Sequence, residues 1–299
     1  MKIFDTHAHY DDEKFNNDRD KVIQGLKESD VVNCINIGCD ITTSQKALEL
    51  ANKYDFIYAA IGIHPSEIEE TREGIDNQIS QIKNIYDGKK VVAIGEIGLD
   101  YHWNNDNTEL QKYAFVQQIA LANDLGLPIS IHTRDAIDDT IGIIREFSVS
   151  CGGVIHCCPF NRELVKHGLE AGLHIAFGGT CTFKNSKNAD EIINMVPLEK
   201  MLVETDSPYL APDPLRGTRN DSRNLVYVID KLASVKGASP EEIANVTYEN
   251  ARKLFSISGW KGDALGTEES QRGRRILADF LPKSSVPFGL SPSPRQNFF

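Results

Sequence analysis

Eight short apolar runs, each followed by a longer and more polar stretch, constrain this chain more than any other feature of its sequence. The runs are rich in β-branched residues and nearly continuous in apolar character, which is typical of parallel strands buried on both faces. They cover residues 3–8, 31–38, 57–63, 91–97, 128–132, 153–157, 174–177 and 201–204. Eight strand-then-helix units predict a (β/α)8 TIM barrel, because eight parallel strands can close on themselves and leave no free edge.

The stretches between the runs carry helical spacing. Residues 108–125 keep an apolar stripe with helical periodicity, and Gly126 then ends the helix. Two further helices are expected after the eighth run, at residues 224–235 and 240–255, the second with Ser239 as its N-cap. A doubly wound open sheet is the alternative architecture, but it would place a glycine-rich turn where this chain has His-Ala-His.

The chain has 299 residues, of which 1–260 are assigned to a single barrel domain. Residues 261–299 change in composition toward Gly, Ser, Pro, Arg and Gln, and their apolar residues have no steady period. We therefore expect a disordered C-terminal tail there.

Composition narrows the class of protein. Hydrophobic residues make up 40% and charged residues 25%, which fits a soluble globular protein. The net charge of −11 argues against a broad basic face for DNA, so a nucleic acid would have to be held locally. No apolar run reaches the ~18 residues of a membrane helix, and no signal peptide is visible. The expectation is a cytoplasmic monomer without membrane contact, also nuclear if the source is eukaryotic.

Six cysteines form no CxxC pair and lie mostly in apolar surroundings. Such cysteines are expected to be buried, reduced thiols, and they indicate no disulfide framework.

Polar side chains with metal-binding chemistry end most of the apolar runs. In a barrel of parallel strands the carboxyl ends meet at one mouth, where active sites are built. The residues at or just after these ends are Asp5, His7, His9, His64, Glu96, His132, His156 and Asp206. His7 and His9 have the period-two spacing that directs two side chains to the same side of a strand.

This convergence favours a divalent-cation centre over a set of hydrogen-bonded core histidines, since imidazole and carboxylate both donate lone pairs to such ions. Four histidines and two acids exceed the three protein ligands of one catalytic zinc. Two cations that share Glu96 are therefore expected. A pair of cations ~3.5 to 4 Å apart can ionise a water and hold the oxygens of a phosphodiester, which favours hydrolysis.

Seven sequence blocks occur in a fixed order, namely THAHY, GIHP, GEIGLDYH, PISIHTRDA, GGVIHC, FGGTCTFKN and ETDSPYLAP. In order and spacing they closely resemble the TatD-type metal-dependent deoxyribonucleases of the amidohydrolase superfamily, over residues 1 to about 255. The resemblance implies a TIM barrel with a two-metal site that hydrolyses phosphodiester bonds. The implied substrate is single-stranded DNA, and sometimes RNA, trimmed from 3′ to 5′, as in DNA repair.

Residue roles are carried over from the resemblance by position. It implies two ligand sets, one of His7, His9, Glu96 and Asp206, the other of Glu96, His132 and His156. Glu96 and Asp206 are the candidate catalytic residues, with Asp206 taking a proton from the attacking water. Mg²⁺, Zn²⁺ and Mn²⁺ all remain open as the cations.

Substrate contacts are expected around the mouth. His64 is expected to touch a substrate phosphate rather than a metal. Arg134, Arg219 and Asn220 would supply local polar and positive contacts, and Tyr101 would stack on an unpaired base. A solvated loop side chain or simple loop packing is the alternative for each.

The sequence departs from the family pattern after His156, where Cys157, Cys158, Pro159 and Phe160 stand in place of the usual Cys-Phe-Ser-Gly. This departure puts the shape of that loop in doubt. Two other functions stay open at this point. One is hydrolysis of another ester, such as D-aminoacyl-tRNA, and the other is a non-catalytic scaffold that binds metal or nucleic acid.

Overall fold

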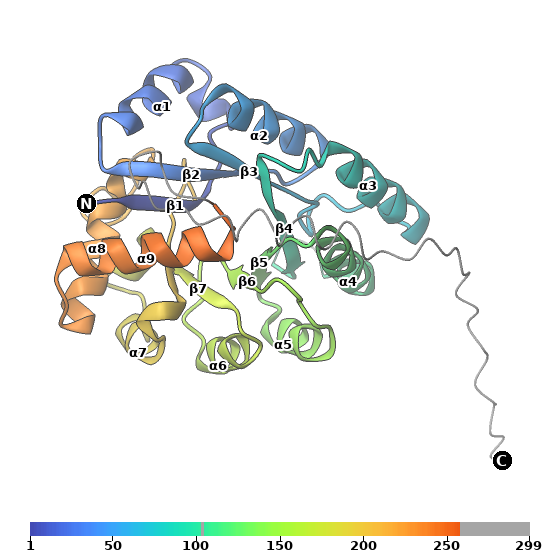
Figure 1. The fold of residues 1–299 in the computed structure, drawn as a ribbon. Coiled ribbons are helices and arrows are strands. Elements are labelled where there is room, and N and C mark those ends of the chain that lie inside the picture. Colours follow the sequence, from blue (N-terminus) through green and yellow to red (C-terminus); the bar gives the residue numbers. More distant parts are fainter. Residues whose placement is uncertain (103–104, 258–299) are drawn as a thin grey trace, which may run out of the picture. The chain divides into compact units, whose positions relative to one another are not determined.

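Eight parallel strands form the centre of the molecule in the computed structural model, which describes residues 1–102 and 105–257 (Figure 1). They follow one another around the sheet in chain order, and each hydrogen-bonded pair is parallel. The strands are β1 (Ile3–Ala8), β2 (Val31–Ile37), β3 (Ile57–Ile61), β4 (Val91–Asp100), β5 (Ile129–Arg134), β6 (Gly153–Ile155), β7 (His174–Phe177) and β8 (Met201–Val203). The eight predicted strands are confirmed, with shifted ends; β4 continues to Asp100.

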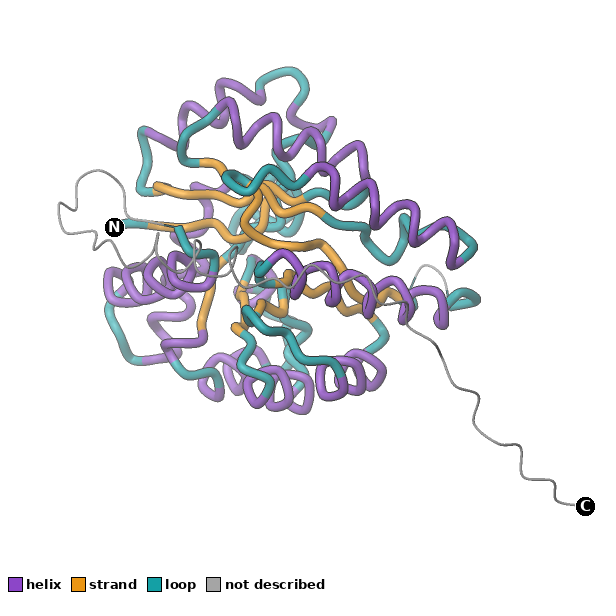
Figure 2. The backbone as a smooth tube through the Cα atoms, turned by 45° about the vertical axis from the view of Figure 1, so that its right-hand side comes forward, coloured by secondary structure: helices purple, strands orange, loops and turns teal. Residues whose placement is uncertain are grey.

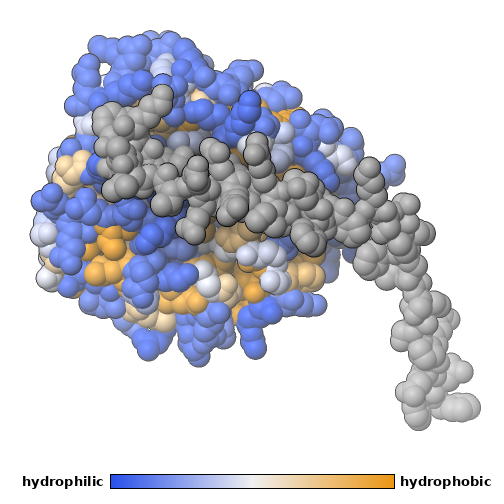
Figure 3. Space-filling view, viewed as in Figure 1, coloured by the Kyte–Doolittle hydropathy of each residue, from blue (hydrophilic) through white to orange (hydrophobic). Residues whose placement is uncertain are grey.

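Helices follow the strands and lie around the outside of the ring (Figure 2). They are α1 (Arg19–Lys27), α2 (Ile41–Lys53), α3 (Arg72–Ile85), α4 (Thr108–Leu125), α5 (Ile137–Glu146), α6 (Arg162–Glu170), α7 (Ala189–Met195), α8 (Leu225–Lys236) and α9 (Pro240–Leu254). Short 3-10 helices occupy Glu13–Phe15, Gly179–Thr182, Leu198–Lys200 and Ser222–Asn224. The outward faces of α1 and α2 are largely hydrophilic (Figure 3), as expected for helices that bury one stripe.

The helix ends agree with the signals in the sequence. Gly126 follows α4 with a left-handed backbone (φ 66°), a conformation that costs glycine little. Ser239 caps α9, where its hydroxyl accepts a hydrogen bond from the Glu242 N–H at 3.2 Å. The three helices predicted around residues 108–125, 224–235 and 240–255 are confirmed to within two residues.

The ring closes between its first and last strands. Ala8 of β1 forms a parallel bridge with Ser207, which follows β8. The N–H of Asp206 donates to the carbonyl of His7 at 2.9 Å, and the N–H of His9 donates to that of Ser207 at 2.7 Å. This closure excludes the doubly wound open sheet and draws the loop after β8 against the end of β1.

The end of the barrel where the strands begin is filled by α9. Phe4, near the start of β1, packs its ring 6.4 Å from that of Tyr248 and 6.2 Å from that of Phe255. These three residues share one buried apolar cluster with residues of six other strands. The opposite end, where His7 and Glu96 lie, is therefore the one available to a substrate.

All six cysteines are free, as predicted. The predicted burial is confirmed for Cys34, Cys158 and Cys181; Cys39 and Cys157 are partly exposed, and for the exposed Cys151 the prediction was wrong. Within residues 1–102 and 105–257, no helix has both the length and the apolar character that crossing a membrane requires. The tail predicted at residues 261–299 lies outside the described residues.

Asp5 ties β1 to the segment that follows β8. One carboxylate oxygen accepts hydrogen bonds from the N–H of Thr205 (3.0 Å) and of His7 (3.2 Å). The other accepts from the hydroxyls of Thr205 and Ser222, both at 2.6 Å. Asp5 is fully buried, so these donors have no access to water as a substitute partner.

We therefore expect Asp5→Ala to lower the free energy of unfolding by roughly 3 kcal/mol or more, since several buried donors lose their acceptor together. Denaturant-induced unfolding followed by circular dichroism measures the change. Asp55→Ala, at an exposed carboxylate, is the control and should change stability little. Equal stability of the two variants would contradict a role for Asp5 in closing the barrel.

Candidate metal centre

The six predicted metal ligands lie together at the carboxyl end of the barrel. Three come from within β1, β4 and β5, and three lie just after β1, β6 and β8. They are His7, His9, Glu96, His132, His156 and Asp206. Ligand atoms of His7, His9 and Asp206 all lie within 4.8 Å of one another, and so do those of His7, Glu96 and His156.

Glu96 stands between two groups of imidazoles. Its Oε1 lies 2.7 Å from Nε2 of His156 and 2.8 Å from Nδ1 of His132. Its Oε2 faces the other group, 3.5 Å from Nε2 of His7 and 4.0 Å from Nε2 of His9. One carboxylate that directs its two oxygens to two donor groups has the arrangement expected of a bridging ligand.

Asp206 completes the group around His7 and His9. Its Oδ1 lies 3.4 Å from Nε2 of His9 and 3.8 Å from Nε2 of His7. The residue has a left-handed backbone (φ 57°), which is uncommon outside glycine and is held by the hydrogen bond from its N–H to the His7 carbonyl. The structure thus brings together His7, His9 and Asp206, three of the four residues in the first ligand set that the resemblance implies.

Neighbouring acceptors orient two histidines. Nδ1 of His9 lies 3.1 Å from the carbonyl oxygen of Ile37, which can only accept, so Nδ1 carries a proton and Nε2 faces the cluster. Nε2 of His132 lies 3.1 Å from Oδ2 of Asp100, so its Nδ1 faces Glu96. Partners of this kind orient metal-binding histidines in known sites.

The resulting donor set fits divalent cations. Nε2 of His7 and Nε2 of His9 face each other at 3.2 Å, and so do Nδ1 of His132 and Nε2 of His156. Two imidazole lone pairs at this distance repel unless a proton or a cation lies between them. The same holds for Nδ1 of His132 and Oε1 of Glu96, at 2.8 Å, so each of these close contacts needs a proton or a cation between its atoms.

Glu96 and His7 already have the ionisation state that a cation needs, whereas burial lowers the pKa values of His9 and His132 but their acidic neighbours outweigh it and raise both. Burial opposes the charge on Glu96, but His156, His64 and His132 outweigh it and hold its pKa well below the usual range. Burial lowers the pKa of His7, and the ring of His156, stacked on it at 4.0 Å, lowers it further. Glu96 is therefore ionised and His7 neutral near pH 7, which are the forms that bind a cation.

Two buried acids at the site were not predicted from the sequence. Asp100 orients His132, as described above, and is 3% exposed. Glu204 is 1% exposed, accepts a hydrogen bond from the N–H of Cys157 at 2.6 Å and lies 3.6 Å from Nδ1 of His156. The sequence did contain a signal, namely period-two spacing, which directs side chains to the same side of a strand. Asp100 lies four residues after Glu96, and Glu204 lies two residues before Asp206.

His64 lies at the edge of the site. Its Nδ1 lies 2.7 Å from the Ser66 hydroxyl and 3.1 Å from the Ser66 N–H, and its Nε2 lies 3.7 Å from Oε1 of Glu96. Burial lowers the pKa of His64 to about 4, so the ring is neutral at pH 7. Its contact with a substrate phosphate, rather than with a metal, stays a prediction.

The other predicted substrate contacts have protein partners. Tyr101 donates its hydroxyl to Asp139 at 2.7 Å, and Arg219 forms two hydrogen bonds with Asp18, at 2.8 and 2.7 Å. Asn220 is 1% exposed, and its amide donates to the Thr205 carbonyl at 3.0 Å. These contacts favour positioning roles for Arg219 and Asn220.

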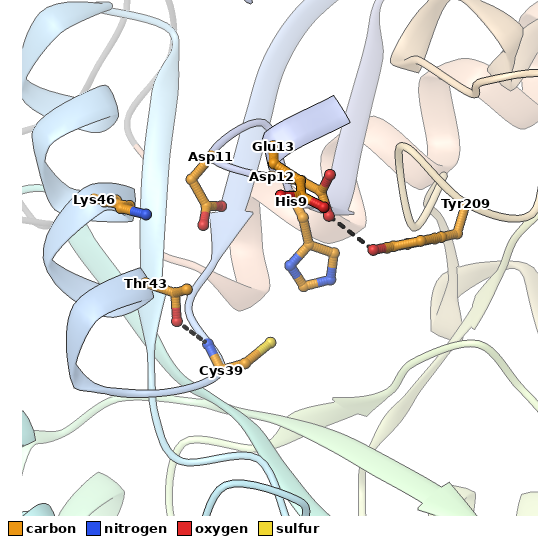
Figure 4. Close-up of a pocket in the computed structure, with 8 residues that line it drawn as sticks. All are labelled: His9, Asp11, Asp12, Glu13, Cys39, Thr43, Lys46 and Tyr209. Atoms are coloured by element: carbon orange, nitrogen blue, oxygen red, sulfur yellow. Dashed lines mark hydrogen bonds between the residues drawn. The ribbon is translucent and has the colours of Figure 1, made fainter. Parts of the chain in front are cut away.

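Arg134 ends β5 in register with Asp100 and is exposed, and its contact with substrate stays a prediction. A cavity of about 280 Å³ adjoins the centre at His9 (Figure 4). Its wall is lined by His9, Asp11, Asp12, Glu13, Cys39, Thr43, Lys46 and Tyr209. Three carboxylates against one ammonium make this side of the mouth acidic.

Known proteins are similar to this chain over most of its length. A family model described as TatD related DNase matches residues 4–256. The chain belongs to the TatD-related DNase family. An uncharacterized metal-dependent hydrolase, YabD of Bacillus subtilis, is 42% identical over 258 residues, which span 86% of this chain and all of that protein.

Two further TatD relatives are informative. A protein of Erwinia billingiae named 3′-5′ ssDNA/RNA exonuclease TatD is 31% identical, over 85% of this chain and 99% of its own length. The crystal structure of YJJV, a TatD homolog from Escherichia coli K12, matches with a TM-score of 0.80 and 27% identity, over 86% of this chain and 98% of that one. The chain is a TatD-family metal-dependent hydrolase with the barrel fold of its relatives.

Cation binding to this TatD-family protein should release protons. In the metal-free protein, burial lowers the pKa of His156, but Glu96 and Glu204 outweigh it and raise the pKa well above its usual value. A cation must displace that proton, so affinity should fall as the pH falls, by about tenfold per pH unit for each displaced proton. Titration of chelator-treated protein with Zn²⁺ or Mn²⁺, with proton release recorded, measures this; binding that does not change between pH 7 and pH 5 would contradict it.

Asp100→Asn should lower cation affinity by about 10- to 100-fold, because an amide can donate to His132 and so stabilise the wrong tautomer. Asp135→Asn, on an exposed carboxylate 3.0 Å from His102, is the matched control and should bind normally. Calorimetric titration with Zn²⁺ compares the two. Unchanged affinity in Asp100→Asn would show that the tautomer of His132 is not set by this contact.

Proposed function

We propose that this protein is a deoxyribonuclease that uses two divalent cations to remove nucleotides from the 3′ end of single-stranded DNA, and of RNA. The main support for the proposal is that the two carboxylate oxygens of Glu96 face two different groups of imidazoles. This arrangement suits a pair of cations that act on one phosphodiester. The name of the Erwinia relative supports the substrate class and the polarity.

The two ligand sets would be His7, His9, Glu96 and Asp206 on one side, and Glu96, His132 and His156 on the other. Divalent cations bound there would polarise a water molecule and neutralise charge on the substrate's phosphate oxygens. Mg²⁺, Mn²⁺ and Zn²⁺ are all compatible with a mixed set of imidazoles and carboxylates.

Asp206 is the group best placed to take the proton of the attacking water. Burial opposes its ionisation, but the imidazoles of His9 and His7 outweigh burial and lower the pKa of its carboxyl. An ionised carboxylate at the open mouth can accept a proton and pass it to solvent. The N–H of His64 would hold a phosphate oxygen beside the reacting centre.

A second candidate is hydrolysis of D-aminoacyl-tRNA. The observation that favours it is the acidic cavity beside His9, since Asp11, Asp12 and Glu13 would attract the ammonium group of an aminoacyl ester. The same carboxylates would repel the backbone of a polynucleotide that passed over them. A nuclease substrate must therefore approach over another side of the mouth.

Cleavage of single strands labelled at the 3′ or the 5′ end, with and without Mg²⁺, Mn²⁺ or Zn²⁺, tests the proposal together with its alternative. We expect stepwise loss from the 3′ end that requires a cation, and no cleavage by Glu96→Ala, since that variant lacks the shared ligand. D-aminoacyl-tRNA is assayed in parallel. Glu70→Ala, at an exposed acid, is the control and should retain activity.

Retained cleavage by folded Glu96→Ala would overturn the two-cation mechanism. Turnover of D-aminoacyl-tRNA without cleavage of oligonucleotides would favour the second candidate. Binding of DNA without any metal-dependent turnover would instead indicate the scaffold considered from the sequence.

A further inference from the structure

Cys39 directs its thiol into the metal centre. Its Sγ lies 3.8 Å from Oε2 of Glu96, the oxygen that faces His7 and His9. Ligand atoms of His9, Cys39 and Glu96 all lie within 4.8 Å of one another, and Figure 4 shows the sulfur on the side of the cavity where His9 lies. The sequence alone indicated only a structural thiol at this position.

The backbone around Cys39 is held on several sides. Its N–H donates to the hydroxyl of Thr43 at 2.8 Å, and its carbonyl accepts from the N–H of His64 at 2.7 Å. The carbonyl of the preceding residue, Gly38, accepts from the N–H of Glu96 at 3.1 Å. The loop that carries the thiol is thus bonded directly to two other residues of the centre, which holds the backbone of Cys39 beside it.

We propose that Cys39 is a further ligand of the cation that His7, His9, Glu96 and Asp206 would hold, and that its sulfur makes this half of the centre prefer a thiophilic cation such as Zn²⁺ over Mg²⁺. This inference rests on the two-cation centre proposed above, but not on the identity of the substrate. The ligand set of the other half, from Glu96, His132 and His156, contains only nitrogen and oxygen.

The chemistry of the donors accounts for the difference between the halves. A thiolate is a soft ligand that selects zinc, whereas Mg²⁺ prefers oxygen and dehydrates reluctantly. Burial raises the pKa of the Cys39 thiol to about 11, so the thiol is protonated at neutral pH until a cation binds. On binding, the S–H bond breaks, the sulfur keeps the electron pair that it shares with the cation, and the proton leaves to solvent.

Cys157 provides a matched comparison. It follows His156 directly, has a left-handed backbone (φ 43°), and is held by the hydrogen bond from its N–H to Glu204. Its thiol lies in the field of Asp206, Glu204 and Glu96, so it also borders the centre. Nothing in the described residues groups its sulfur with the histidine nitrogens, in contrast to Cys39.

Cobalt substitution tests the proposal by a signal that does not depend on activity. The full-length protein is stripped with chelator and titrated with one and then two equivalents of Co²⁺, and the near-ultraviolet sulfur-to-cobalt charge-transfer band is recorded. We expect the band in the native protein, in Cys157→Ser and in Cys151→Ser. It should be lost in Cys39→Ser and Cys39→Ala, while the visible cobalt bands show that both variants still fold and bind the ion.

Competition titrations add a measure of selectivity. Zn²⁺ affinity should fall by about 10- to 100-fold in Cys39→Ser, with little change for Mg²⁺. A native protein that binds cobalt and cleaves DNA without the band, or a band lost only in Cys157→Ser, would overturn the role of Cys39 and leave the nuclease proposal standing. A native protein that binds no cobalt, zinc or magnesium would overturn both.

Discussion

The pairing of one buried carboxylate with imidazoles from three other strands is the interaction on which this centre depends. Glu96 is 5% exposed, and an isolated ionised carboxylate at such a position would cost several kcal/mol. Its two oxygens instead face His132 and His156 on one side and His7 and His9 on the other. Without the Glu96 carboxylate, the two ligand sets would lose the residue that they share, and four imidazoles would face one another without an acid between them.

Barrel closure makes this pairing possible. Asp206 reaches His7 and His9 because its own N–H is bonded to the His7 carbonyl across the seam between β8 and β1. Asp5, beneath this seam, holds the same two segments through Thr205. The seam therefore stabilises the fold and positions a ligand at the same time, so damage to it should affect stability and cation binding together.

Much of the fold could be predicted because parallel strands buried on both faces carry a signal that polar segments do not. The convergence of His7, Glu96 and His132 could be expected from this, since parallel strands end at one mouth, although Glu96 lies within β4 and not at its end. The role of α9 could not be predicted, because an amphipathic pattern shows which face is buried but not what it packs against. In the structure Tyr248 and Phe255 meet Phe4 inside the barrel.

The residues that could not be predicted are those that contact the proposed metal ligands and orient them. Asp100 and Glu204 resemble ordinary strand-end acids in the sequence, and only distances show that one faces Nε2 of His132 and the other Nδ1 of His156. Cys39 was interpreted as structural because its surroundings are apolar, and its direction depends on a loop fixed by Thr43 and His64. Local periodicity contains no information about such contacts.

The charge of the centre explains how an acidic chain could act on an anionic substrate. Among the proposed ligands only Glu96 and Asp206 carry negative charge, so two divalent cations would leave an excess of two positive charges on the ligand set, which the acids Asp100 and Glu204 behind the histidines would offset. A phosphate would therefore be held by direct contact with the cations, while the net charge of −11 is spread over the whole molecule and screened by salt. A thiolate from Cys39 would reduce the excess to one, so the same residue that favours zinc would also weaken the attraction for phosphate on its side of the centre.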